Sequence, residues 1–154
     1  MTNPSPANEL AEFAMARLEE FTEAGLSGRT VLVVGLGSVG REAARLAKNL
    51  GMRVLAVNRI GQTDLPYVDE IRTSRFLGDL LPVAHAVVLA LPLTEETRGM
   101  IDASTITRMR FDSVVVNVGS AGVIDEAALL DAVAEGRVAG AAFAGDERIR
   151  LQHS

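Results

Sequence analysis

The stretch VVGLGSVGREAARLAKNLG, residues 33–51, predicts a strand, a glycine-rich turn and a helix in direct succession. The apolar run TVLVVG leads into the turn, as is typical of a strand that is covered on both faces. The helix is predicted over residues 41–50 and ends at Gly51. A second apolar run, residues 53–57, predicts the next strand of a parallel sheet.

Three glycines in this turn carry the clearest chemical signal. Gly35, Gly37 and Gly40 fit the spacing G-x-G-x-x-G. The first glycine permits the tight turn, the second lets backbone approach a pyrophosphate, and the third lets the helix pack closely on the strand. The N-terminus of the following helix directs free N–H groups and its positive dipole end toward the phosphates. The flanking strands are the context that a dinucleotide-binding turn requires, so we favour nucleotide binding over a purely structural turn.

The residues after the second strand predict which dinucleotide binds. An acidic residue there would accept hydrogen bonds from the adenosine ribose of NAD and would repel the 2′-phosphate of NADP. This chain has Asn58, which is neutral, followed by Arg59, whose guanidinium can pair with a phosphate. We therefore expect NADP to be preferred over NAD. In the alternative interpretation Arg59 is solvated and Asn58 holds the ribose as a neutral partner.

The chain as a whole alternates strands and helices, which predicts an α/β fold with a parallel sheet and right-handed crossovers. We expect a single Rossmann-type, doubly wound domain of three layers and about six parallel strands. It is expected to cover residues 9–147, between an N-terminal tail (residues 1–8) and a C-terminal tail (residues 148–154). The expected helices cover residues 9–23, 41–50, 104–110 and 125–135, with one or two helical turns at 75–81; further strands cover residues 86–92, 113–118 and 137–143, and a short edge strand lies within 67–73.

Composition narrows the functional classes. The net charge of −5 in 154 residues argues against nucleic-acid and anionic-membrane partners. The sequence has no cysteine and two histidines, so we expect no disulfide, no thiolate catalysis and no Cys- or His-built metal site. No apolar run reaches the roughly 18 residues that span a bilayer, and residues 1–8 do not have the pattern of a signal peptide. We expect a cytoplasmic protein.

Four segments, in this order, resemble a known family. They are ANELAEFAMARL, GLGSVG, LALPLTEETRGMID and NVGSAGVIDEAALLDAVAEGRVAGAAF. Together they resemble the nucleotide-binding domain of the D-isomer-specific 2-hydroxyacid dehydrogenases, from about residue 7 to residue 147. The combination of PLTEET with the downstream N-x-x-x-x-G-x-I-D-E-x-A-L pattern is far more specific than the glycine turn. The resemblance implies hydride transfer between a nicotinamide cofactor and a 2-hydroxy or 2-keto acid.

The resemblance also implies a cofactor site by position. For Thr97 a helix-capping hydroxyl is an equally good interpretation. The implied cofactor-binding positions are Ser38 and Val39 beside the pyrophosphate, Asn58 at the ribose, Leu91 and Pro92 on the adenine side, Thr97 in the following turn, and Val118, Gly119 and Ser120 under the nicotinamide end.

The departures from the family pattern concern catalysis. The family carries an arginine that binds the substrate carboxylate where this chain has Ser120, and an aspartate where this chain has Ala144. The family's glutamate is out of register at Glu147, and its histidine belongs to a downstream segment that we expect to be missing here. His153 is too near the end to be held in place, and His85 is interpreted as structural or surface-exposed. We therefore predict no catalytic residue; Asp125 and Glu126 are interpreted as helix-start residues.

Two functions stay open at this point. The chain is either the cofactor-binding part of a hydroxyacid dehydrogenase whose substrate domain is missing, and which is inactive alone, or a stand-alone binding or interaction module without catalysis. Another nucleotide is disfavoured because no G-x-x-x-x-G-K-[ST] loop is present. In the family this domain carries the dimer contact, so we expect a homodimer through the first long helix, whose apolar stripe includes Phe13, Leu18 and Phe21. The alternative is that this stripe packs on the domain's own sheet.

Overall fold

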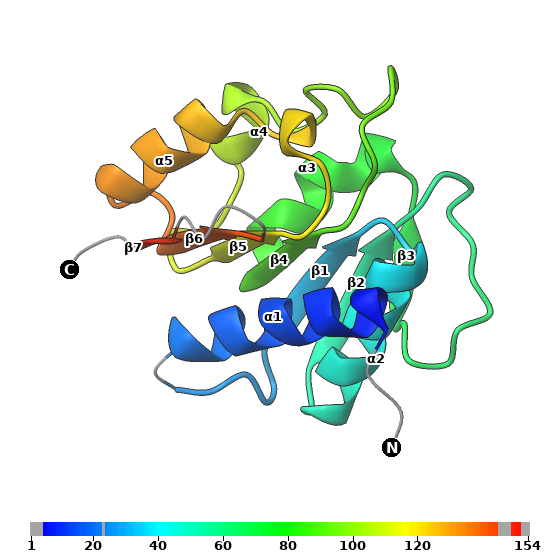
Figure 1. Cartoon of the computed structure of the whole chain (residues 1–154). Helices are drawn as coiled ribbons and strands as arrows, with labels where there is room; N and C mark the ends of the chain where they lie inside the picture. Colours follow the sequence, from blue (N-terminus) through cyan, green and yellow to red (C-terminus); the bar gives the residue numbers. More distant parts are fainter. Residues whose placement is uncertain (1–4, 23, 145–148, 152–154) are drawn as a thin grey trace.

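The computed structural model describes residues 5–22, 24–144 and 149–151, which form a sheet between two layers of helices (Figure 1). The strands lie in the order β3-β2-β1-β4-β5-β6-β7. Strands β1 to β6 pair in parallel, whereas β7 is antiparallel to β6. This parallel order is that of a Rossmann-type doubly wound sheet, so the predicted fold class is confirmed. The strands are β1 (Thr30–Val34), β2 (Arg53–Val57), β3 (Glu70–Arg72), β4 (Ala86–Leu89), β5 (Val114–Asn117), β6 (Gly140–Phe143) and β7 (Ile149–Leu151).

The apolar runs of the sequence form strands that are buried on both faces. In β1, Val31 and Val33 belong to one hydrophobic core, and Leu32 and Val34 belong to the other. Successive side chains of a strand point to opposite faces of the sheet, so an uninterrupted apolar run contributes to two cores at once. Strands β4, β5 and β6 are buried along their whole length for the same reason.

The helices divide between the two faces of the sheet, as Figure 1 shows. Helices α1 (Pro6–Glu20) and α2 (Ser38–Asn49) cover one face. The other face carries α3 (Leu77–Leu80), α4 (Ala103–Ile106) and α5 (Glu126–Ala134), together with the short 3-10 turns η1 (Ser74–Phe76), η2 (Leu81–Val83) and η3 (Ala121–Val123).

Several boundaries differ from the predicted ones for local reasons. Helix α1 begins at Pro6, inside the expected tail, because the Ser5 hydroxyl caps it by accepting a hydrogen bond from the Asn8 N–H at 3.1 Å. Helix α2 begins at Ser38, so the second half of the glycine turn is already helical. Strand β7 lies where the C-terminal tail was expected. The remaining expected tail residues, 1–4, 148 and 152–154, lie outside the described residues, as do 145–147 at the end of the expected domain.

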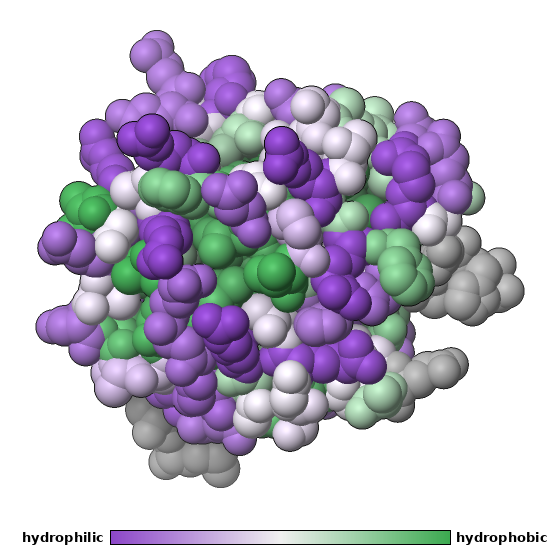
Figure 2. Space-filling view, turned by 180° about the vertical axis from the view of Figure 1, so that it is seen from behind, coloured by the Kyte–Doolittle hydropathy of each residue, from purple (hydrophilic) through white to green (hydrophobic). Residues whose placement is uncertain are grey.

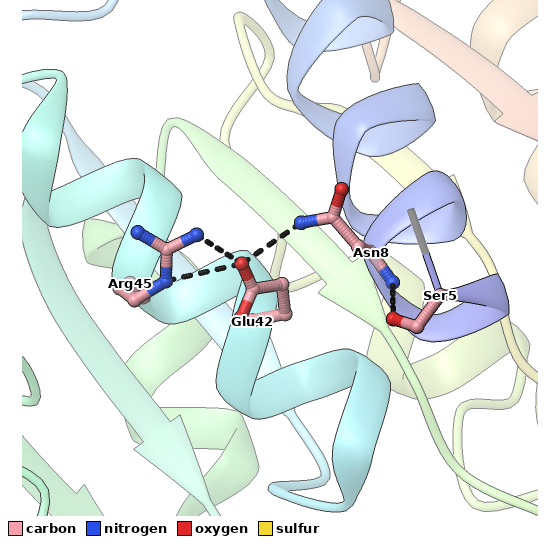
Figure 3. Close-up of polar contacts among 4 residues, drawn as sticks. All are labelled: Ser5, Asn8, Glu42 and Arg45. Carbon is pink, nitrogen blue, oxygen red and sulfur yellow. Dashed lines mark hydrogen bonds and ion pairs between the residues drawn. The ribbon is translucent and has the colours of Figure 1, made fainter. Parts of the chain in front are cut away.

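A polar cluster ties the start of α1 to α2 (Figure 3). The Asn8 side-chain amide donates to a Glu42 carboxylate oxygen at 2.9 Å, and the Arg45 Nε donates to the same oxygen at 3.0 Å. The hydrogen bond from Arg45 is the main reason that the pKa of Glu42 lies below its ordinary value. Because α2 begins at the glycine turn, this contact fixes α1 relative to that turn.

The apolar stripe of α1 is split between the core and the surface. Leu18 is completely buried against the sheet and α2, so it is not available to a second chain, and the alternative interpretation holds for this residue. Phe13 and Phe21 are half-buried at the margin of the same core. Arg17, the polar exception in the stripe, stacks over the Phe13 ring at 5.5 Å from its centroid and pairs with Glu20 at 2.9 Å.

Some apolar side chains are exposed on the surface of the domain. Figure 2 shows the face seen from behind, where apolar residues gather near the centre and hydrophilic residues surround them. Two large apolar side chains are largely exposed, Ile60 at 71% and Phe111 at 70%. Within the described ranges, no helix combines the length and apolar character needed to cross a bilayer.

His85 links the starts of β1 and β4, at the end of the strands opposite the glycine turn. It precedes β4, and its Nδ1 accepts a hydrogen bond from the Thr30 N–H at the start of β1, at 3.2 Å. This bond requires an unprotonated Nδ1. Burial lowers the pKa of His85, Arg110 and Arg29 lower it further, and Asp112 acts in the opposite direction. His85 therefore has a structural role.

We expect the stability of the fold to fall as the pH decreases below about 6.5, the ordinary pKa of histidine. The unfolded chain takes up the His85 proton first because the folded pKa is lowered, so the stabilisation is present above 6.5 and is lost toward the folded pKa. Urea unfolding between pH 5 and pH 8 measures this loss. His85→Asn keeps an acceptor for Thr30 without titrating, so its stability should be flatter over this window. His153→Gln is the control; an equally steep dependence in His85→Asn would contradict the assignment.

Candidate functional site

The first glycine of the turn stands between the ends of two strands. Gly35 has φ +102°, a conformation that side chains other than glycine rarely adopt. A Cβ at this position would lie 2.8 Å from the Ala90 carbonyl oxygen and 2.8 Å from a Leu91 methyl group. The Gly35 N–H donates to the Val57 carbonyl oxygen at the end of β2. The turn therefore begins where β1, β2 and β4 all end.

The rest of the turn combines one very close contact with one open position. A Cβ on Gly40 would lie 1.7 Å from the Gly35 carbonyl oxygen, so only glycine fits where α2 crosses the turn. Gly37, by contrast, has no atom within 4 Å of an added Cβ, and no side chain caps the helix at this residue. The first N–H groups of α2, at Ser38 and Val39, have no partner within the helix. The open position thus lies beside free donors, a cradle that fits a phosphate.

Asn58 follows β2 and organises the loop after it. Its side-chain oxygen accepts a hydrogen bond from the Gly61 N–H at 2.7 Å, and its side-chain nitrogen donates to the Gln62 carbonyl oxygen at 2.8 Å. The amide therefore shapes its own loop, a role that sequence reasoning did not assign to it. An amide oxygen accepts two hydrogen bonds and the NH₂ donates two, so one of each is left for another group.

A cavity of about 240 Å³ lies between the end of β2 and the loop that follows β4. We call it the central cavity. Its apolar lining comes from Val57, Leu91, Pro92 and Met100. Its polar lining is formed by Asn58, Arg59, Ser74, Thr94, Glu96 and Thr97. A cavity with both apolar and polar lining residues can hold a heterocyclic base and its sugar.

Thr97 closes the loop that forms one wall of this cavity. Its hydroxyl donates to the Pro92 carbonyl oxygen at 2.7 Å and accepts from the Thr94 N–H at 2.8 Å. The side chain is buried, with 8% exposed. The hydroxyl therefore caps a loop turn, where the sequence suggested either a helix cap or a ligand contact. Thr94 and Met100, which sequence reasoning did not single out, complete this wall.

A buried amide shapes the segment after β5, and backbone hydrogen bonds from this segment to Leu89 and Leu91 hold it against the end of β4. The Asn117 side chain accepts from the Gly119 N–H at 2.9 Å and donates to the Ser120 carbonyl oxygen at 3.2 Å. A Cβ on Gly119 would lie 2.5 Å from the Leu91 carbonyl oxygen, so glycine is needed at this contact. The segment from Val118 to Ser120 is thereby placed beside Leu91. Sequence reasoning missed Asn117, although it is the polar end of an otherwise apolar strand.

The sequence-predicted residues thus gather along one edge of the sheet, where the parallel strands end. The glycine turn lies after β1, Asn58 and Arg59 after β2, Leu91 and Pro92 after β4, and the 118–120 segment after β5. Asn58 also lines a second cavity, of about 490 Å³, whose lining includes Arg41, which sequence reasoning missed. Across the described ranges, no group of three or more His, Cys, Asp or Glu side chains is placed to hold a metal ion.

The two glycines at the start of α2 should differ sharply in their tolerance of a methyl group. Gly40→Ala forces the helix away from the Gly35 carbonyl and should lower the free energy of unfolding by more than about 2 kcal/mol. Gly37→Ala meets no atom and should change it by less than about 1 kcal/mol. Urea unfolding of both variants measures the difference. Equal effects would show that the close approach at Gly40 is not required.

The geometry agrees with the comparisons to known proteins. Residues 7–146 match the model of the D-isomer specific 2-hydroxyacid dehydrogenase, NAD binding domain. A glyoxylate reductase of Thermococcus gammatolerans is 39% identical over 116 residues, which are 74% of this chain and 34% of that protein. A glycerate dehydrogenase of Methylorubrum extorquens is 33% identical over 118 residues, 77% of this chain and 35% of that protein.

A solved structure shows the same arrangement. A D-isomer specific 2-hydroxyacid dehydrogenase family protein from Aeromonas salmonicida superposes with a TM-score of 0.78 at 28% identity, covering 89% of this chain and 49% of that one. The chain thus spans about a third of the length of the two curated relatives and about half of this solved chain. It belongs to the family of NAD-binding domains of the D-isomer-specific 2-hydroxyacid dehydrogenases.

Proposed function

We propose that the chain binds a nicotinamide dinucleotide along the edge of the sheet where the parallel strands end. The diphosphate would lie at Gly37, Ser38 and Val39, where an open position meets free helix N–H groups. The open space at Gly37 beside the tightly closed Gly40 is the observation that carries the proposal. The adenosine would occupy the central cavity, with Asn58 at its ribose and Leu91 and Pro92 along the base. The nicotinamide end would lie over Val118, Gly119 and Ser120.

We infer that the whole protein to which this domain contributes is an oxidoreductase acting on a 2-hydroxy or 2-keto acid. The bound nicotinamide supplies or accepts the hydride. The residues of this domain bind and orient the cofactor, and we assign no catalytic residue among them. Ser120 has no charge with which to hold a substrate carboxylate, and Ala144 has no polar group at the nicotinamide end. A second candidate function, a binding module without catalysis, is favoured by these two residues.

We propose that NADP(H) binds more tightly than NAD(H). Asn58 removes the negative charge that would repel a 2′-phosphate, and its second donor hydrogen remains for a ribose or phosphate oxygen. Arg59, which lines the central cavity, is 82% exposed and can turn its guanidinium toward the phosphate. Arg41, on the first turn of α2, lines the second cavity together with Asn58. An arginine therefore lines each of the two cavities that include Asn58.

Calorimetric titration of the chain with NADPH and with NADH tests both proposals. We expect binding of both nucleotides, with NADPH the tighter ligand. Gly37→Ala should weaken both by roughly tenfold or more, because its methyl group occupies the space that the diphosphate approaches, while its stability is kept. We also expect negligible reduction of 2-keto acids by the chain alone. Tighter binding of NADH would contradict the preference, and binding of neither nucleotide at millimolar concentration would contradict the function.

We propose that the chain forms a homodimer through α1. Phe13 and Phe21 are only half-buried on this helix. A shallow groove runs between α1 and the end of α2. Its apolar lining comes from Met15, Ala16, Leu46 and Leu50, and Glu12, Glu19 and Asn49 line it as well. Leu50 is 38% exposed, so the apolar lining of this groove continues to the surface at the end of α2.

Sedimentation velocity at micromolar concentration should show a dimer. Ala16→Arg places a long cation in the groove from an exposed helix position, so it should shift the distribution to monomer without affecting the core. Thr107→Arg, at an exposed position on the opposite side of the sheet, is the control for added charge. A wild-type chain that sediments only as a monomer would contradict the dimer.

A further inference from the structure

An ion pair reaches across the rim of the central cavity. The Arg59 Nη2 lies 3.2 Å from the Glu96 Oε1, and both side chains line the cavity. Arg59 lies in the loop after β2, whereas Glu96 lies in the loop after β4 that Thr97 closes. The pair therefore joins the two walls between which the adenosine is proposed to bind.

We propose that Glu96 sets the discrimination between phosphorylated and unphosphorylated adenosine ribose, by competing with the 2′-phosphate for the Arg59 guanidinium. This inference rests on the proposed function. The Glu96 carboxylate accepts from the Arg59 Nη2, and a phosphate that binds the guanidinium through paired N–H groups including this one must displace the carboxylate. A nucleotide without the 2′-phosphate leaves the Arg59–Glu96 ion pair in place. Removing this ion pair should therefore not change the affinity for such a nucleotide.

Exposure limits the strength of this competition. Arg59 is 82% exposed and Glu96 is 67% exposed. Exposed pairs are weak, and their loss typically changes an equilibrium by roughly two- to fivefold. The carboxylate also repels a phosphate nearby, which acts in the same direction and is screened by salt. Glu96 should therefore tune the selectivity without controlling whether a dinucleotide binds.

Two further arginines lie near Glu96 and could interact with its carboxylate if a phosphate displaced it from Arg59. Glu96 also lines a neighbouring cavity of about 320 Å³, together with Arg75 and Arg108. Arg75 lies over the Phe76 ring, and Arg108 makes a long hydrogen bond of 3.5 Å to the Gly78 carbonyl oxygen. Over the described residues, neither guanidinium has a carboxylate partner. The positive charge of this second cavity would favour the carboxylate after a phosphate has taken Arg59.

The test is titration of Glu96→Gln with NADPH and with NADH. We expect NADPH to bind roughly two- to fivefold more tightly than to the wild type, and NADH to be unchanged within error. Glu95→Gln is the matched control, because Glu95 is the adjacent exposed glutamate and does not line the central cavity. It removes the same charge and should leave both affinities unchanged. The gain for NADPH should shrink as the salt concentration rises.

The Arg59→Gln variant tests whether Glu96 affects NADPH binding through Arg59. In this background Glu96→Gln should improve NADPH binding clearly less than it does in the wild type, because the contested guanidinium has been removed and only the salt-screened repulsion is left. An effect of Glu96→Gln no larger than that of Glu95→Gln would overturn the inference while leaving dinucleotide binding intact. Weaker binding of both nucleotides to Glu96→Gln would also overturn it, because Glu96 would then contact the adenosine directly. Binding of neither nucleotide to the wild-type chain would reject the proposed function itself.

Discussion

The close approach of α2 to the turn that precedes it is the contact on which the geometry of this turn depends. The Cα of Gly40 lies so near the Gly35 carbonyl oxygen that no side chain fits between them. This contact brings the start of α2 directly over the end of β1, and it leaves Gly37 open between them. The other site segments lie beside this turn because β2 and β4 both pair with β1 and end at the same edge of the sheet. A Rossmann-type sheet reverses its winding between β1 and β4, which is where its ligands bind.

The walls around this point are held by polar groups that act on backbone. Asn58, Thr97 and Asn117 each bind main-chain groups of their own loops, and together they shape the loops after β2, β4 and β5. These bonds orient the loops without charge. The charged groups, Arg41, Arg59 and Glu96, lie at the exposed rim instead. The site is therefore rigid where shape matters and adjustable where ionic recognition is proposed.

The fold class could be predicted from the sequence because apolar strand patterns and helix patterns alternate along the chain. The run TVLVVG could be interpreted as a doubly buried strand, and the glycine spacing indicated how the next helix would cross it. Helix ends were less predictable, since the start of α1 depends on the Ser5 hydroxyl. The positions proposed from the sequence lie together at the ends of β1, β2, β4 and β5, but their hydrogen-bond partners were not predictable. Nothing in the sequence showed that Glu96, far from Arg59 along the chain, would pair with it, or that Leu18 would be the inward part of the α1 stripe.

Strand β7 affects whether copies of this domain can associate through the edges of their sheets. The last parallel strand of an open sheet presents a row of unpaired amides that can recruit a strand from another molecule. Here β7 pairs with β6 in the opposite direction along Gly140–Ala142 and takes up that row. At the far edge, β3 is only three residues long and carries the Glu70–Arg72 ion pair. The free edge on the β6 side is moved to β7, which is also three residues long. Short edge strands on both sides, with charge at β3, discourage edge-to-edge polymerisation.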